Sequence, residues 1–379
     1  MNCRGIAIDI GSTNIAAALI AEDGRVRFTS KNLNLQTTVS ADIIGRIGGE
    51  YGLLRRLLME SVNKTVSELC AAAGIKPEGL PASVAGNTLM SCFFAGLPAE
   101  SLGHAPFKSP SLFGDEYDID GFICGKAYIA PCFGAFVGGD ISAGLLSAPA
   151  LRKGGMLYID AGTNGEVYGC LDGKALVCSA AAGPALENGI GCASRSGGSI
   201  ADSVRRTEDG TLEPVCRDGT AAAGLSGSGV ISLMSLIIGR ECSCSGHLTG
   251  GSLSLGGGLV LRDPDVCAFQ LAKAAIAAAV LCVMRGLAMR PSECRKVCLA
   301  GAMGSAVSEK ALLRTGLLPD FAAGKTVPLG NSALKGAALL LDGEYRKKAL
   351  SYTRNAKVLP LDKSEYFKEC FAEELFFDE

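Results

Sequence analysis

The chain has 379 residues, and 50 of them are glycine, nearly twice the usual share of about 7%. A hydrophobic fraction of 48% and a net charge of −2 exclude an intrinsically disordered chain, and the glycines lack the three-residue period of collagen. Basic residues (36) are balanced by acidic ones (38), which argues against nucleic-acid binding. A mechanism built on several histidines is also disfavoured, because only His104 and His247 are present.

The start of the chain shows no charged segment and no small-residue cleavage site, so we expect no signal peptide. The most apolar helix candidate, residues 271–287, contains Lys273 and Arg285 and is expected to be too short and too charged to cross a membrane. These features predict a cytoplasmic protein that does not associate with membranes. In a reducing compartment, most of the 16 cysteines would be buried thiols.

The first predicted elements form a hairpin that recurs later in the chain. Strands at 5–10 and 15–20 flank a tight polar turn and are followed by a strand at 26–29. The same plan returns with strands at 156–160, 166–170 and 174–178. Both hairpins carry Asp-x-Gly-[Ser/Thr]-[Thr/Asn], from Asp9 to Thr13 and from Asp160 to Asn164. A chance match of five residues is the alternative, but the shared context favours two similar halves.

The remaining elements in chain order predict an α/β protein with two halves, residues 1–148 and 149–379. Helical spacing of apolar residues and glycine or proline breaks set their limits. They are a helix at 51–73, a strand end at 83–88 that leads into a helix at 89–95, a Gly/Ser-rich loop at 189–199, helices at 230–238 and 263–287, a strand at 297–301, and an acidic amphipathic helix at 366–377.

A strand-end aspartate followed by a glycine-rich hairpin suits the binding of a metal and a phosphate. Small turn residues let backbone N–H groups approach phosphate oxygens, and carboxylate oxygens bind Mg²⁺. Asp9 and Asp160 are therefore candidate metal ligands, and an ordinary turn is the alternative for each. The sequence contains no Gly-x4-Gly-Lys-[Ser/Thr] element, and a dinucleotide-binding fingerprint is poorly supported, so another nucleotide fold is indicated.

Three further glycine-rich segments extend this pattern. Asp140 stands in Gly-Gly-Asp at an expected helix start, where it could orient or deprotonate a water or could merely cap the helix. Gly227, Ser228 and Gly229 open a helix whose N-terminus favours anions. Residues 300–305, which include Gly301 and Gly304, form a strand-to-helix turn against which a nucleoside could lie.

The order of these segments resembles the acetate kinase–sugar kinase–Hsp70–actin (ASKHA) superfamily. The chain is more specifically similar to the ATPase region of the reductive activators of corrinoid proteins. Beyond the two hairpins, the similarity is carried by Ala-Gly-Asn-Thr-Leu-Met at 85–90, Ser-Leu-Gly-His-Ala-Pro-Phe at 101–107, Val-Gly-Gly-Asp-Ile-Ser-Ala at 137–143, Asp-Ala-Gly-Thr-Asn-Gly-Glu at 160–166, Ala-Ala-Gly-Pro-Ala-Leu-Glu at 181–187, Gln-Leu-Ala-Lys-Ala-Ala-Ile at 270–276, Thr-Gly-Leu-Leu-Pro-Asp at 315–320 and the tail at 371–377.

This resemblance implies a two-lobed ASKHA fold, a duplicated RNase H-like α/β architecture like that of actin, Hsp70 and sugar kinases, with a nucleotide cleft between the lobes. Asp9, Asp140 and Asp160 would be catalytic, and Asp9 and Asp160 would hold Mg²⁺. ATP would be bound by a set of small and polar residues: Gly11, Ser12, Thr13, Gly162, Thr163, Asn164, Glu187, Gly227, Ser228, Gly229, Gly301 and Gly304. Ala302 and Met303 depart from the glycine pattern of the adenosine segment.

The family uses ATP to drive reduction of a corrinoid cobalt from Co(II) to Co(I), and its ATPase domain often pairs into a homodimer. Family members commonly carry a ferredoxin-like region ahead of the ATPase part, whereas here the first hairpin begins at residue 5. The resemblance therefore implies a separate iron–sulfur electron donor and a corrinoid protein as partners. Two alternatives stay open, a small-molecule kinase and a nucleotide-gated binding module, because the hairpins are common to all three.

The cysteines lack the spacing of a ferredoxin, so no iron–sulfur cluster is expected in this chain. Cys242 and Cys244 form the closest grouping and are the candidate for a metal site, against the simpler interpretation of scattered thiols. His104 and His247 are interpreted as loop residues that form hydrogen bonds.

Overall fold

The computed structural model describes residues 3–40, 43–151, 153–187, 189–193, 198–301, 303–304 and 307–378. The chain forms two compact units. One contains Met1–Pro149 and Asn331–Val358, and the other contains Ala150–Gly330 and Leu359–Glu379. The boundary between the halves thus lies one residue from the expected 148/149, but the sequence did not reveal that a later segment returns to the first unit. The return has a packing reason, because this segment forms a helix that contacts three strands of the first sheet.

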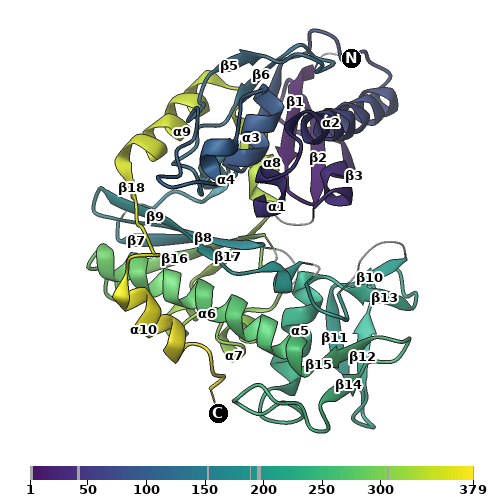
Figure 1. The fold of residues 1–379 in the computed structure, drawn as a ribbon, viewed down its shortest axis with the longest axis vertical. Helices are drawn as coiled ribbons and strands as arrows, with labels where there is room; N and C mark the ends of the chain where they lie inside the picture. The colour runs from purple at the N-terminus through teal and green to yellow at the C-terminus, as the bar shows by residue number, and fades with distance from the viewer. Residues whose placement is uncertain are drawn as a thin grey trace. The chain divides into compact units, whose positions relative to one another are not determined.

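The first unit is built on a sheet with strand order β3-β2-β1-β4-β6-β5 (Figure 1). Strand β1 is antiparallel to β2 and parallel to β4. Alternation along β1 sends Ile6, Ile8 and Ile10 into a core shared with α2 and α3, and sends Ala7 toward α4 and α8 on the opposite face. The elements are β1 Cys3–Ile10, β2 Asn14–Ala21, β3 Val26–Leu33, η1 Leu35–Thr38, α1 Ile43–Ile47, α2 Tyr51–Ala73, β4 Ala82–Gly86, α3 Thr88–Ala95, η2 Glu100–Leu102, β5 Glu116–Asp118, β6 Lys126–Ile129, α4 Gly139–Ser147, α8 Ser332–Leu339, α9 Gly343–Asn355 and β18 Ala356–Val358.

Small residues let α4 and α8 approach closely in the first unit. A Cβ atom built on Gly336 of α8 would overlap the backbone of Ala143 in α4. Alanines from β1, β2, β4 and both helices complete this cluster. The glycine and alanine of the returning segment therefore suit it to the sheet face that carries Ala7.

The second unit repeats the plan, with the strands β17-β16-β7-β8-β9 adjacent in that order. A smaller layer holds the parallel pair β10–β13 and the antiparallel pairs β11–β12 and β14–β15. The elements are β7 Gly155–Ala161, β8 Asn164–Leu171, β9 Lys174–Ala181, η3 Pro184–Leu186, β10 Ser199–Ala201, β11 Ser203–Arg206, β12 Leu212–Val215, β13 Ala222–Leu225, α5 Gly227–Ile237, β14 Ser252–Ser254, β15 Val260–Arg262, α6 Asp263–Gly286, β16 Cys294–Gly301, α7 Glu309–Arg314, η4 Asp320–Ala322, β17 Thr326–Gly330 and α10 Glu365–Glu373.

The register of the strands shows how the two sheets correspond. Asp9 of β1 lies opposite Ala85 of the parallel strand β4, and Asp160 of β7 lies opposite Ala300 of the parallel strand β16. Each aspartate strand also has an antiparallel hairpin partner, β2 or β8. The repeat predicted from two short motifs thus extends to three strands in each sheet: β1, β2 and β4 in the first correspond to β7, β8 and β16 in the second.

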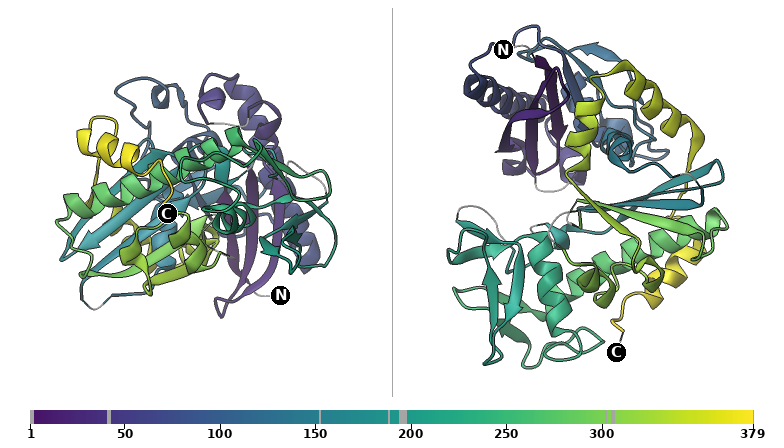
Figure 2. Two further views of the ribbon diagram at one scale, coloured as in Figure 1. Left: turned by 90° about the horizontal axis from the view of Figure 1, so that it is seen from below. Right: turned by 180° about the vertical axis from the view of Figure 1, so that it is seen from behind.

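Helix α6 runs along the second sheet, and α10 packs on it (Figure 2). Its 24 residues and a mean hydropathy of 2.1 over its most apolar window make it long and apolar enough to cross a membrane, which corrects the sequence expectation that it is too short. The expected length rests on the apolar stretch 271–287 alone, whereas the whole helix, predicted at 263–287, spans Asp263–Gly286. Since 78% of that window is buried in the protein, the helix has the features of a core helix.

The tail helix α10 ends at Glu373, before the predicted end at residue 377. Beyond it, Phe377 is buried, and its N–H donates to the Cys244 carbonyl at 2.9 Å. Lys273 of α6 is only 2% exposed, and its Nζ lies 3.5 Å from Glu374. Burial lowers the pKa of Lys273, and the nearby Glu374 carboxylate partly offsets this effect.

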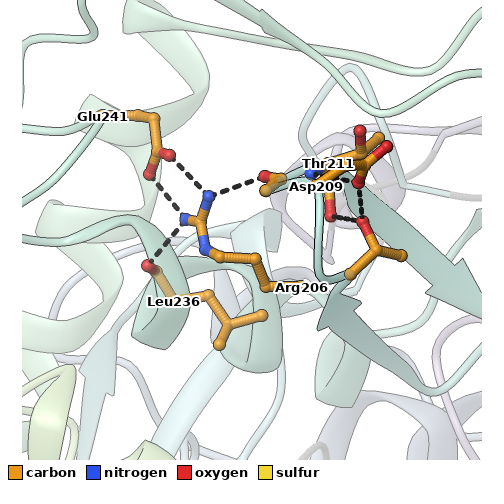
Figure 3. Close-up of polar contacts among 7 residues, drawn as sticks. Arg206, Asp209, Thr211, Leu236 and Glu241 are labelled. Carbon is orange, nitrogen blue, oxygen red and sulfur yellow. Dashed lines mark hydrogen bonds and ion pairs between the residues drawn. The ribbon is translucent and has the colours of Figure 1, made fainter.

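An ion pair anchors the hairpin β11–β12 beside α5 (Figure 3). The guanidinium of Arg206 donates to both carboxylate oxygens of Glu241, at 2.7 and 2.8 Å, and to the Leu236 carbonyl near the end of α5 at 3.2 Å. In the hairpin turn, Thr211 N–H donates to Asp209 at 3.2 Å. The bonds of Arg206 thus connect the end of β11 to the end of α5, and the bond of Thr211 stabilises the turn itself.

Candidate functional site

The first hairpin loop consists of Gly11, Ser12 and Thr13, between β1 and β2. Gly11 N–H donates to the Asn14 carbonyl at 3.0 Å, which closes the loop. A Cβ atom on residue 11 would lie 2.7 Å from that carbonyl oxygen, so only glycine fits without a shift. The loop therefore presents bare backbone at one end of β1, as the sequence predicted.

Asp9 lies near the end of β1, next to this loop. Its Oδ2 accepts a hydrogen bond of 2.8 Å from Nδ2 of Asn331. Asn331 is also the N-cap of α8, because its side chain accepts from Leu334 N–H at 2.8 Å. Although the carboxylate keeps some exposure to solvent, burial raises the pKa of Asp9 to about 6, and the Asn331 hydrogen bond acts in the opposite direction.

Asp140 lies in the first turn of α4, where its Oδ1 accepts from Ile141 N–H at 2.9 Å. Gly138 precedes the helix with its backbone against Asn87, and any side chain at Gly138 would overlap Asn87. Burial and the negative charge of Asp9 raise the pKa of Asp140 to about 7, against the hydrogen bond from Ile141. Asp140 is therefore not the helix cap that one interpretation expected, because Gly138 holds the N-cap position, and its carboxylate lies close enough to Asp9 to feel its charge.

The Asp9 and Asp140 carboxylates fit a divalent cation. Each is partly withdrawn from water, and the charge of Asp9 disfavours ionisation of Asp140. A cation between or beside them would remove this repulsion, and Mg²⁺ prefers carboxylate oxygen and water ligands. The adjoining loop of small residues suits phosphate oxygens.

The second hairpin loop is one residue shorter than the first. Gly162 N–H donates to the Asn164 carbonyl at 2.9 Å, so Asn164 corresponds to Asn14 and not to Thr13, which corrects the alignment of the two motifs. Glu187, just after η3, covers this loop. Its two carboxylate oxygens accept from Thr163 N–H at 3.0 Å and from Thr163 Oγ1 at 3.1 Å. A carboxylate thus occupies the donors that the sequence assigned to phosphate.

Asp160 and Gly301 lie side by side in the second unit. Gly301 has φ of +61°, and a Cβ atom there would overlap both the Asp160 carboxylate and the Ala161 carbonyl. Gly304 follows, and its carbonyl accepts from Gly330 N–H at 2.6 Å. Of the adenosine segment, Ala302 and Ser305 lie outside the described residues, whereas Met303 is buried.

Gly227, Ser228 and Gly229 form the first turn of α5, so this helix begins three residues earlier than predicted. Ser226 is its N-cap, with Oγ accepting from Gly229 N–H at 3.3 Å and lying 2.8 Å from Ser228 Oγ. Ser226 also donates to Asp202 at 3.1 Å. The helix N-terminus is therefore organised by a polar network of its own.

The structure brings Asp9, Asp140 and the first hairpin loop together in one unit, and Asp160, the second hairpin loop, Glu187 and Gly301 in the other. The sequence analysis missed Asn331, although an asparagine before the helix-forming run Ser-Ala-Leu-Lys is a recognisable N-cap signal. It also missed the long-range contact to Asp9, which no local pattern could reveal.

The cysteines are all free thiols. Cys242 is buried, which raises the pKa of its thiol to about 11, and Cys244 contacts the Asp378 carbonyl through its sulfur at 3.8 Å. Within the described ranges no group of three or more His, Cys, Asp or Glu side chains is arranged to hold a metal ion.

A hollow of about 550 Å³ on the hairpin β11–β12 has an acidic and hydroxyl-rich lining that includes Glu208, Asp209 and Glu213. It contains none of the residues predicted to bind nucleotide. We therefore assign the candidate site to the hairpin loops and their aspartates, and not to this hollow.

The duplicated sheet, the paired hairpin loops and the aspartate at the end of each central strand define a protein of the ASKHA class. Residues 4–152 match the RACo middle region, and residues 155–249 and 248–379 match the C-terminal domain of RACo, the ASKHA domain. The chain therefore belongs to the RACo family, the reductive activators that the sequence resembles.

Two relatives are identical to this chain at somewhat more than a quarter of the aligned positions. It is 28% identical over 389 residues to the corrinoid activation enzyme RamQ of Eubacterium limosum, covering 89% of this chain and 64% of that protein. It is 27% identical over 253 residues to the [Co(II) methylated amine-specific corrinoid protein] reductase of Methanosarcina barkeri, covering 60% and 46%.

A solved structure of a reductive activator for corrinoid, iron–sulfur protein superposes with a TM-score of 0.87 at 27% identity, covering 98% of this chain and 66% of that one. The chain thus spans about half to two thirds of the length of these relatives.

Proposed function

We propose that this chain binds and hydrolyses ATP with Mg²⁺ and that the turnover supports reductive reactivation of a corrinoid protein. The observation that carries the proposal is the match to both RACo regions along residues 4–379. The partly buried carboxylate pair beside a glycine loop supports the ATP and Mg²⁺ part.

In the proposed reaction, ATP and water yield ADP and phosphate. Bound Mg²⁺ would neutralise phosphate charge and polarise the transferred phosphoryl group. Asp9 would hold the ion, with Asn331 fixing its carboxylate, and Asp160 is proposed as a second metal-binding carboxylate. Asp140, whose carboxylate lies near Asp9 at the start of α4, is proposed to accept a proton from the attacking water.

For nucleotide to bind at the second hairpin loop, a phosphate would have to replace the Glu187 carboxylate. Glu187 occupies Thr163 N–H and Oγ1, the donors that a phosphate would use. Binding of nucleotide to these donors would displace the Glu187 carboxylate. We propose that this exchange is one local event through which ATP changes the surface of the second unit.

The redox step would be the transfer of one electron to corrinoid Co(II), giving Co(I), from a reduced iron–sulfur donor that is oxidised in turn. We propose that the electron donor is a separate protein or domain. We also propose that two copies of this chain pair as a homodimer in the cytoplasm. The activities for which the relatives are named, corrinoid activation and corrinoid protein reduction, support the corrinoid partner.

The ATPase proposal is tested with Asp9→Asn and a control, Asp118→Asn, which alters an aspartate with 83% side-chain exposure in the same unit. We expect Asp9→Asn to lower kcat by at least about a hundredfold, because it removes a metal-binding charge, and the control to behave as wild type. Turnover of Asp9→Asn at the wild-type rate would contradict the site assignment.

The corrinoid part is tested anaerobically by adding a Co(II) corrinoid protein and a reduced donor and following Co(I) by its visible spectrum. We expect Co(I) to form with ATP and not with ADP. Phosphate transfer to a sugar or carboxylate without any dependence on the corrinoid protein would instead identify a small-molecule kinase. Tight ATP binding without hydrolysis would identify a nucleotide-gated binding module.

A further inference from the structure

Asn34, at the end of β3, is bonded to the first hairpin loop at two points. Its Nδ2 donates to the Gly11 carbonyl at 3.0 Å, and its backbone N–H donates to the Thr13 carbonyl at 2.9 Å. The side chain is fully buried, with 0% exposure. A single residue therefore holds the first and last carbonyls of the three-residue loop.

These bonds set the direction of the loop N–H groups. In a trans peptide, the C=O and the N–H of one peptide unit point in opposite directions. When Asn34 holds the Gly11 carbonyl, the N–H of Ser12 in the same peptide unit is directed away from Asn34. The loop is thereby fixed with backbone donors on its other side, which is what binding of a phosphate oxygen requires.

A buried polar network holds Asn34 in turn. Its Oδ1 accepts from Gln36 N–H at 3.1 Å, and Gln36 Nε2 donates to the Leu54 carbonyl of α2 at 2.9 Å. Arg46 donates to Gln36 Oε1 at 3.2 Å and to the Ser40 carbonyl at 2.9 Å. Gln36 and Arg46 are fully buried like Asn34. Such a network costs free energy to disrupt, so it resists rotation of the Asn34 side chain.

We propose that Asn34 is a positioning residue that presets the first hairpin loop for the phosphates of the nucleotide. This inference rests on the proposed ATP-binding function. Asn34 does not contact the nucleotide in this proposal and acts through the loop. Presetting the loop removes the cost of ordering it when the nucleotide binds.

The competing explanation is that Asn34 serves only as the N-cap of η1, whose Gln36 N–H it accepts. Asn34→Ser separates the two roles. Serine is as good an N-cap as asparagine, but it is too short to reach the Gly11 carbonyl. Asn34→Ala removes both roles.

Asn63 supplies a matched control. Its Nδ2 donates to the Gly121 carbonyl at 2.7 Å, and its Oδ1 accepts from Ile123 N–H at 3.1 Å, so it also clamps a loop of the first unit. Asn63→Ala therefore reports the cost of losing a loop clamp that serves no part of the candidate site.

The experiment measures binding of Mg-ATP by calorimetry, steady-state ATPase kinetics and hydrogen exchange of the peptide that covers residues 9–16. We expect Asn34→Ser to weaken binding and raise KM by about fivefold to tenfold, the effect of one lost hydrogen bond, with kcat changed less than about threefold. The 9–16 peptide should exchange faster, while Asn63→Ala leaves KM and that peptide unchanged. A purely structural role would lower the active fraction, and hence kcat, without raising KM.

Wild-type affinity and wild-type exchange in Asn34→Ser would overturn the inference. The exchange measurement needs no nucleotide, so it also separates this inference from the proposed function. If the wild-type protein binds no Mg-ATP, the proposed function fails, and faster exchange of the loop in Asn34→Ser then shows that Asn34 still positions it. If Asn34→Ala does not fold, Asn34→Ser carries the test.

Discussion

Replacing Asp140 by asparagine should stabilise the protein at pH 8, although it removes a candidate catalytic group. The carboxylate is partly buried and faces Asp9, and its pKa is raised from 3.8 to about 7 in the folded state. Above pH 7 the folded protein must therefore hold an ionised group that the unfolded chain ionises more easily. The amide oxygen introduced by Asp140→Asn would keep an acceptor for Ile141 N–H without this charge, so the substitution relieves the repulsion.

The magnitude follows from linkage between protonation and folding. A shift of about three pKa units corresponds to about 4 kcal/mol at pH 8, and screening by solvent at the partly exposed carboxylate reduces this to about 2 kcal/mol. For a folding unit of this size the gain corresponds to a rise in Tm of about 4–8 °C.

The sign of the pH dependence is fixed by the direction of the shift. A carboxylate whose folded pKa is raised favours the folded state below its unfolded pKa, and that contribution is lost as pH rises through the folded pKa. The gain from Asp140→Asn should therefore be full at pH 8, fall to less than half at pH 5 and vanish near pH 4.

The assay is thermal unfolding without nucleotide at pH 8 and pH 5, with Asp118→Asn as the exposed control and with or without MgCl2. Mg²⁺ should stabilise the wild-type protein more than Asp140→Asn. A variant less stable than wild type at pH 8, or a gain equal at both pH values, would refute the reasoning about the carboxylate pair.

Two further predictions concern the second unit. In a denaturant titration, Gly301→Ala should destabilise this unit by at least about 2 kcal/mol more than Gly173→Ala. Both glycines have positive φ, but only Gly301 leaves no room for a Cβ atom. Equal losses of stability in the two variants would contradict this prediction. By the same titration, Arg206→Ala should lower the free energy of unfolding by about 1–2 kcal/mol, because its ion pair with Glu241 is partly buried. Arg205→Ala breaks an exposed ion pair and should lower it by less than about 0.5 kcal/mol. Equal effects of the two changes would exclude burial as the reason. Neither arginine change should alter the affinity for Mg-ATP.

The elements of the candidate site differ in how they could be found. Asp9, Gly11 and Gly162 were visible in the sequence, since a strand-end aspartate and a glycine turn are local patterns. Asp140 was visible too, but its local pattern fitted a helix cap as well as a base. The raised pKa arises because the fold buries the carboxylate and places it near Asp9.

Glu187 has a contact that its motif does not reveal. Its sequence context predicts a nucleotide-binding residue, and in the structure its carboxylate accepts from the N–H and Oγ1 of Thr163. A carboxylate that occupies anion-binding donors competes with phosphate and does not bind it. That relation depends on the path of the chain from β9 to η3, which no spacing in the sequence encodes.

Local patterns in the sequence were enough to predict the central strands, the two glycine hairpins and the repeat that relates them, because each depends on alternation and turn chemistry within a few residues, whereas the short strands β5, β6 and β10 to β15 were not predicted. Only the folded chain shows which distant groups meet: Asn331 with Asp9, Asn34 with Gly11, and the segment Asn331–Val358 with the first sheet. Buried polar groups require partners wherever the chain can bring them. Those partners lie 23 residues away for Asn34 and 322 residues away for Asp9, beyond the reach of any local pattern.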